Sequence, residues 1–160
     1  MRLHFILVAV LALAATIAVT LAGAAELPPL SQDGVPNGYR GKPEVVVAGQ
    51  AAYRAYCASC HGDESSQPMA EAPDLRRLNG FCRRLKDPAL AERCLKDVDS
   101  YWLFSVREGK VRAGVVHMPP WKDVLTAQQI WAIRTFVESR PLDPPKRTTS
   151  VDAARQAPGR

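Results

Sequence analysis

Cys57-Ala58-Ser59-Cys60-His61 is the stretch of sequence that decides what this chain folds around. Two thiols three positions apart can form thioether bonds to the two vinyl groups of one porphyrin, and a histidine that follows directly can bind the iron through a ring nitrogen. This spacing is typical of covalent haem attachment. The motif therefore predicts that Cys57, Cys60 and His61 hold one haem c.

Paired cysteines also occur in two other kinds of site. A thioredoxin-like redox pair needs a βαβ context and has no ligand histidine after it. A zinc site needs four ligands, and the sequence has no second Cys/His pair close to this one. Haem attachment is the better interpretation, and the single copy of the motif predicts a monohaem protein.

The start of the chain has the layout of an export signal. Arg2 precedes an uncharged run from Phe5 to Ala25, which ends in the small residues Ala22-Gly23-Ala24. A positive start, an apolar middle and a small-residue cleavage site are typical of a signal peptide. We expect residues 1–24 to be removed and the protein to be periplasmic, where bacteria attach c-type haem. An uncleaved membrane anchor is the alternative, because the apolar run is long.

The rest of the chain suits one domain between two irregular segments. Removing residues 1–24 removes one of 21 basic residues and no acidic one, which leaves a net charge of +4, too small to indicate nucleic-acid binding. The Pro/Gly-rich stretch 25–43 is predicted to be a linker, and 141–160 a disordered tail. The folded domain is expected over 44–140. No phosphate loop or nucleophile–base pattern indicates hydrolytic or nucleotide chemistry.

The domain is predicted to be all-α. Helix signals run from about 46 into the haem motif, over 87–93 and 99–108, and from 126 to 137. Asp87 can cap the second of these helices, with Pro88 at its first position. Thr126 and Gln129 form a capping box at the start of the last. Strand patterns are confined to 45–47 and 111–116, which are short and ambiguous.

Other motifs accompany the haem motif. They are Gly49-x-x-x-Tyr53 before it, Ala72-Pro73-Asp74-Leu75 and Met118-Pro119-Pro120-Trp121 after it, and a final helix that contains Trp131. Together they resemble class I cytochromes c over about residues 44–140. The resemblance implies that the first and last helices cross beside a covalently bound haem, one edge of which is exposed.

The resemblance also implies a partner for the second ring nitrogen of His61. In that family a proline carbonyl accepts the ring N–H of the haem histidine, which fixes its tautomer and strengthens it as a ligand. Pro73 takes this place here, although Ala72 and Asp74 stand where the family commonly has Gly and Asn. An ordinary turn proline is the alternative.

A second axial ligand must come from farther along the chain. Met69 is only eight residues past His61, whereas Met118 is 57 residues on and precedes two prolines that stiffen its loop. The family also has its axial methionine directly before a proline. We therefore predict that His61 and Met118 bind the iron. His117, which would point to the other side of the loop, is the competing ligand and would lower the reduction potential.

Two cysteines remain outside the haem motif. Cys82 and Cys94 are twelve positions apart, and in an oxidising compartment a disulfide between them is the expected pairing. It would close an insertion over 81–95 and contribute about 3 kcal/mol in the chain-entropy model. Two free thiols or a metal site are the alternatives.

The same region is rich in basic residues. A run of them has no acid among its members: Arg76, Arg77, Arg83, Arg84 and Lys86. A solvated face is the usual interpretation of such a run. A basic rim would also speed the encounter with an acidic redox partner.

Iron with histidine and methionine ligands has no open coordination position, which predicts one-electron transfer and not an enzyme. Trp121 and Phe104 are expected to raise the potential by excluding water. We expect a monomeric electron carrier that does not bind nucleic acid. A haem enzyme or gas-binding sensor with an open iron site is the alternative, as is a membrane-anchored haem subunit of a larger oxidoreductase.

A resemblance also suggests the redox partners. The closed insertion, Glu108-Gly109-Lys110-Val111 and His117-Met118-Pro119 resemble cytochromes c that accept electrons from PQQ-dependent (quinoprotein) alcohol dehydrogenases. Such carriers pass electrons on to a terminal oxidase or another cytochrome. The resemblance therefore implies such a dehydrogenase as the donor.

Overall fold

The computed structural model describes residues 26–30, 34–66 and 72–142. The expected signal peptide, Met69 and the tail from 143 onward lie outside the described residues. Among the residues that are described, no helix combines the length and the apolar character needed to cross a membrane.

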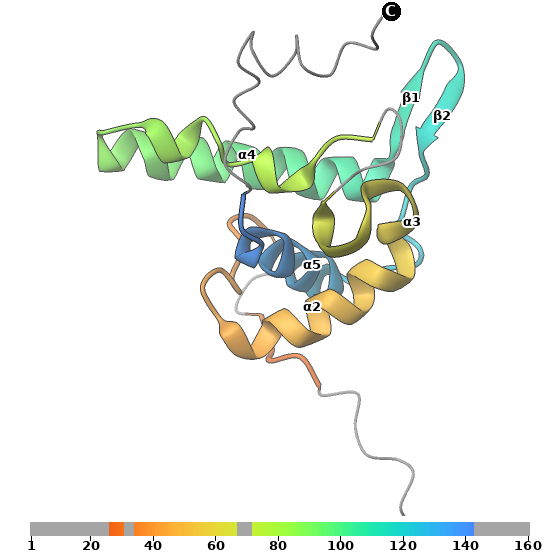
Figure 1. Cartoon of the computed structure of the whole chain (residues 1–160), viewed down its shortest axis with the longest axis horizontal. Helices are drawn as coiled ribbons and strands as arrows, with labels where there is room; N and C mark the ends of the chain where they lie inside the picture. The colour runs from red at the N-terminus through yellow and green to blue at the C-terminus, as the bar shows by residue number, and fades with distance from the viewer. Residues whose placement is uncertain (1–25, 31–33, 67–71, 143–160) are drawn as a thin grey trace, which may run out of the picture.

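The described chain is mostly helical, with one hairpin (Figure 1). Its elements, in chain order, are α2 (Pro43–Tyr56), α3 (Ala58–His61), the short 3-10 helices η2 (Asp63–Ser65), η3 (Leu75–Arg77) and η4 (Cys82–Arg84), α4 (Pro88–Glu108), β1 (Lys110–Arg112), β2 (Val115–Met118) and α5 (Ala127–Ser139). The predicted capping box at Thr126 and Gln129 is present at the start of α5.

The core lies where α2 packs across α5 (Figure 1). Gly49 allows this approach, because a Cβ there would lie 2.0 Å from the carbonyl oxygen of Ala132. One turn farther along α2, the rings of Tyr53 and Phe136 meet with centroids 5.1 Å apart. The first and last helices of the domain therefore pack together, as the resemblance implies.

α4 is one continuous helix where the sequence predicts two. Asp87 caps it as predicted, accepting hydrogen bonds from the backbone N–H groups of Ala89 at 2.9 Å and Leu90 at 3.1 Å. No Gly or Pro stands between 93 and 99, so nothing interrupts the helical hydrogen bonds. Only the second half of α4 contributes buried residues, beginning at Asp99. The apolar pattern is broken because the first half lies outside the core.

A two-stranded hairpin follows α4. β1 pairs antiparallel with β2, with Lys110 opposite Met118. The chain reverses at Ala113 and Gly114, both of which have positive φ. The valine-rich stretch that is ambiguous in the sequence therefore forms strands, and its valines are exposed. The fold is helical with this one addition.

Residues 34–42 pack on the domain, although the sequence predicts a linker over 25–43. Asn37 and Tyr39 are buried. The Asn37 amide donates a hydrogen bond to Thr135 Oγ1 at 3.1 Å, and the Tyr39 hydroxyl donates to the carbonyl of Pro28. Burying the tyrosine ring removes a large apolar area from water, which offsets the entropy lost in ordering this segment.

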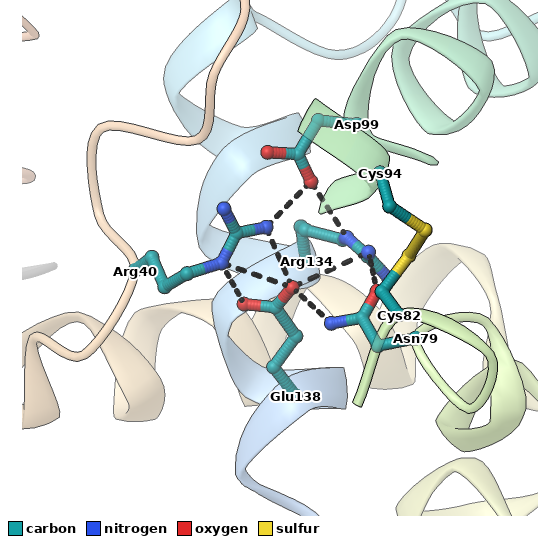
Figure 2. Close-up of a disulfide and its surroundings, with 7 residues drawn as sticks. All are labelled: Arg40, Asn79, Cys82, Cys94, Asp99, Arg134 and Glu138. Atoms are coloured by element: carbon teal, nitrogen blue, oxygen red, sulfur yellow. Dashed lines mark hydrogen bonds and ion pairs between the residues drawn. A yellow bond between two sulfur atoms is a disulfide. The ribbon is translucent and has the colours of Figure 1, made fainter. Parts of the chain in front are cut away.

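Figure 2 shows a buried ionic network that joins this segment to α4 and α5. Asp99 is fully buried and accepts from Arg40 at 2.6 Å and from Arg134 at 3.4 Å. Glu138 pairs with the same two arginines, at 2.8 and 3.3 Å. The Asn79 side chain accepts from Arg134 at 2.5 Å and donates to Glu138 at 2.9 Å. Two cations and two anions thus neutralise each other, as burial of charge requires.

The predicted disulfide between Cys82 and Cys94 is present beside this network (Figure 2). It joins η4 to the first half of α4, with the two Cα atoms 5.6 Å apart. The insertion is therefore closed by a covalent bond at a place where little apolar burial holds it.

Candidate haem-binding site

The haem motif continues the helical path of α2 into α3. The backbone N–H of Cys57 donates to the carbonyl of Tyr53 at 2.8 Å, and that of His61 to the carbonyl of Cys57 at 2.9 Å. Residues three and four positions apart lie on one face of a helix. Cys57, Cys60 and His61 therefore face the same side. Both thiols are free, with Cys57 half-buried and Cys60 exposed.

Burial raises the pKa of the Cys57 thiol to about 12, and a negative charge on Cys60 would add to this effect. Redox-active cysteine pairs have lowered thiol pKa values, because the thiolate is the reactive form. A thiol that stays protonated at neutral pH is poorly suited to disulfide exchange. The pair therefore lacks the activated thiol that is typical of a thioredoxin-like role.

His61 is held in one tautomer. Its Nδ1 lies 3.0 Å from the carbonyl oxygen of Pro73. Because a carbonyl can only accept, Nδ1 carries the proton, and in the neutral ring Nε2 has a free lone pair. The residue is 9% exposed. The Tyr53 hydroxyl donates to the carbonyl of Gly62 at 2.8 Å and so fixes the turn that follows the histidine.

Asp74 fixes the peptide that carries the Pro73 carbonyl. Its carboxylate caps η3 by accepting the backbone N–H of Arg76 at 3.1 Å, and it also binds the Arg76 guanidinium at 3.0 Å. Arg77 adds a second ion pair at 3.2 Å. The hydrogen bond from the Arg76 side chain is the main cause that lowers the pKa of Asp74. Two members of the basic run are therefore engaged beside the site.

Met118 lies at the end of β2. Its side chain is half-buried against the core, whereas that of His117 is exposed. Successive residues of a strand point to opposite faces, so the methionine faces inward and the histidine outward. Gly109, at the end of α4, packs against this segment: a Cβ there would lie 2.4 Å from the Met118 carbonyl oxygen. No larger residue would allow that approach.

A ring contact ties the methionine segment to the haem motif. Trp121 meets Tyr56, the residue before Cys57, edge to face with centroids 5.5 Å apart. The Trp121 backbone N–H donates to the carbonyl of Val106 at 3.0 Å, which anchors the loop on α4. Phe104 does not join this cluster: it is 62% exposed, and the Lys110 ammonium lies 5.8 Å from the centre of its ring.

The donor set fits a haem. It comprises two unpaired thiols, an imidazole with a free Nε2 and an inward-facing thioether, on elements that Tyr56 and Trp121 hold together. Sequence reasoning missed Asp74 and Gly109 as supports. Asp74 could have been recognised from the sequence, because an Asp directly before a helical turn is a typical N-cap. The contact made by Gly109 depends on tertiary structure alone.

Comparison with known proteins agrees with these features. Residues 44–137 match the protein family described as "Cytochrome C oxidase, cbb3-type, subunit III". Over 98 residues the chain is 34% identical to a protein of Pseudomonas aeruginosa named cytochrome c550, a region that covers 61% of this chain and 57% of that relative. No solved structure matches the chain.

Proposed function

The chain belongs to the cytochrome c family, and from this premise we propose that Cys57 and Cys60 tether its haem while His61 and Met118 bind the iron. Proteins of this family carry covalently bound haem c and transfer electrons; they are not enzymes. The bound haem supplies an iron that changes between the ferric and ferrous states.

The hydrogen bond between His61 Nδ1 and the Pro73 carbonyl supports this assignment most directly. It presents Nε2 as a ligand and strengthens the imidazole as an electron donor. A thioether from Met118 would favour the ferrous state, since it stabilises the lower charge. Tyr56 and Trp121 would keep water from the ligands. With both axial positions filled by protein, electron transfer is the chemistry that remains.

Mass spectrometry of denatured protein tests the attachment. Protein matured with the haem-attachment machinery should retain one haem after acid denaturation. The Cys57→Ser/Cys60→Ser double variant should release its haem under the same conditions. Haem that acid extracts from the wild-type protein would contradict the proposed thioether bonds.

We propose further that the protein works in the periplasm as a carrier from a PQQ-dependent alcohol dehydrogenase towards a terminal oxidase. Residues 1–24 would act as the export signal. The Cys82–Cys94 disulfide supports this location, because disulfides persist in the oxidising periplasm. The test is to mix oxidised protein with such a dehydrogenase and its alcohol. Rapid haem reduction is expected; a rate no higher than without the dehydrogenase would refute this donor.

A haem subunit of an oxidase is a second candidate, favoured by the family's description as an oxidase subunit. The two proposals differ in what the native protein is attached to. Size-exclusion chromatography of a gently extracted native sample distinguishes them. Elution as a small haem protein supports the carrier, and co-elution with oxidase subunits supports the second candidate.

A further inference from the structure

The first half of α4 is an arm outside the core. Residues 88–98, all of which the structure describes, include no buried residue, and buried positions begin at Asp99. In Figure 1 this half of α4, drawn in lighter green, extends past the ends of α2 and α5. The disulfide holds η4 against it. We refer to residues 81–97 as the arm.

A groove with an apolar floor runs along the arm. It is an open hollow of about 720 Å³, and its apolar lining, which we call the floor, consists of Phe81, Leu85, Leu90 and Cys94. Phe81 is 63% and Leu90 43% exposed. Exposing such side chains to water is unfavourable, by about 25 cal/mol for each Å² of apolar surface. Neither side chain contributes to the core, so the fold does not account for them.

The rim of the groove is mainly basic. Arg93 and Lys96 line it, and the guanidinium of Arg84 lies 5.8 Å from the centre of the Phe81 ring. Among the described residues that line the groove, Asp97 is the one acid. An apolar floor with a cationic rim matches a ligand that has an apolar centre and anionic flanks.

We propose that this groove binds an acidic segment of a partner protein. One apolar side chain of that segment lies between Phe81 and Leu90, and its carboxylates face Arg84, Arg93 and Lys96. The hollow shape favours a protruding side chain over a flat membrane surface. The disulfide keeps the two walls of the groove in register, which reduces the entropy lost on binding. None of the proposed haem ligands lines this groove, so peptide binding there can be measured independently of electron transfer.

A peptide titration followed by NMR tests the proposal. The probe is a short synthetic peptide of glutamates with a central leucine and tryptophan, added to ¹⁵N-labelled, haem-loaded protein. We expect saturable shifts concentrated in the amides of residues 81–97, weakened by added salt because the rim charges are screened. The same peptide with lysine in place of every glutamate should cause no saturable shift. Shifts outside the arm, or equal shifts with both peptides, would overturn the proposal.

Matched variants separate the rim from net charge. Arg93→Glu should weaken binding at least about tenfold, because it places a like charge opposite the peptide. Arg83→Glu is the control: Arg83 also belongs to the arm but lines a different hollow, beside residues 40–46 and 135–139. It changes the net charge by the same amount, and its effect should stay within about twofold. Equal losses in the two variants would contradict a specific groove.

The floor has its own test. Leu90→Ser changes an exposed residue, so the variant should fold, as its circular dichroism will show. It should weaken peptide binding, because the apolar centre of the peptide loses its contact. Vesicles of phosphatidylglycerol are the other probe. Leu90-dependent binding to these vesicles without peptide shifts would overturn the proposal in favour of a membrane surface.

Discussion

Substitution of Gly49 by alanine tests the helix crossing at the centre of this fold. The added Cβ would lie 2.0 Å from the Ala132 carbonyl oxygen, 2.6 Å from its carbon and 3.0 Å from Phe136 Cβ. Ordinary contact begins near 3.4 Å, so α2 and α5 would have to part by about 1.4 Å along this direction. Backbone atoms cannot rotate away, so the helices themselves must move.

The two opposing effects of Gly49→Ala can be compared. Alanine in a helix is favoured over glycine by about 1 kcal/mol. Overpacking a filled core costs about 1–3 kcal/mol, and more where the obstacle is backbone. Separating the helices also weakens the contact between the Tyr53 and Phe136 rings. We expect a net loss of about 2 kcal/mol or more, which for a domain of this size lowers the melting temperature by roughly 10 °C.

The assay is urea and thermal unfolding of haem-loaded protein, followed by far-ultraviolet circular dichroism. Val47→Ala is the control on the same helix, because Val47 is 73% exposed. That variant should be neutral or slightly stabilising, since alanine is the better helix former. A Gly49→Ala protein that is as stable as the wild type, or more stable by the helix-propensity gain, would refute the close crossing.

Three further predictions concern stability. Asp99→Asn should cost about 3 kcal/mol in urea unfolding, because it leaves the buried Arg134 with one of its two anionic partners; a loss under about 0.5 kcal/mol would mean that the network is hydrated. Reducing the Cys82–Cys94 bond with dithiothreitol should lower the free energy of unfolding by up to about 3 kcal/mol, and the urea midpoint with it. An unchanged midpoint would show that the arm unfolds separately. Hydrogen bonds, foremost from the Gln50 side chain, lower the pKa of Glu64 below its ordinary 4.5. The stability that ionised Glu64 contributes is therefore fully present above pH 4.5 and is lost as the pH falls through the lowered pKa. Glu64→Gln should therefore cost less than about 1 kcal/mol at neutral pH and still less near pH 3; an equal cost at both would contradict this account.

The helices and the haem motif could be predicted because local sequence determines them. Asp87 and Thr126 satisfy free N–H groups within their own first turn, and the Cys-x-x-Cys-His spacing is fixed by the porphyrin. The Cys82–Cys94 bond followed from counting the cysteines left over. The continuity of α4 could not be seen, since a helix half outside the core has no apolar period to mark it.

Tertiary contacts account for what the sequence pattern missed. Arg134 sits within an otherwise apolar stripe of α5, and only the fold shows that Asp99 and Glu138 surround it. Tyr39 lies in a stretch with the composition of a linker, yet its ring enters the core. The bond between His61 and Pro73 was implied by family resemblance and could not have been derived from spacing alone.

The most direct test of the proposed site is the visible spectrum of the oxidised, haem-loaded protein in the far-red. Iron bound by a methionine thioether gives a weak charge-transfer band there. With Met118 as the ligand, the band is present in the wild type and in His117→Ala, and is lost in Met118→Ala. A low-spin spectrum without the band would contradict Met118 as the ligand, and a high-spin spectrum would contradict a closed electron-transfer site.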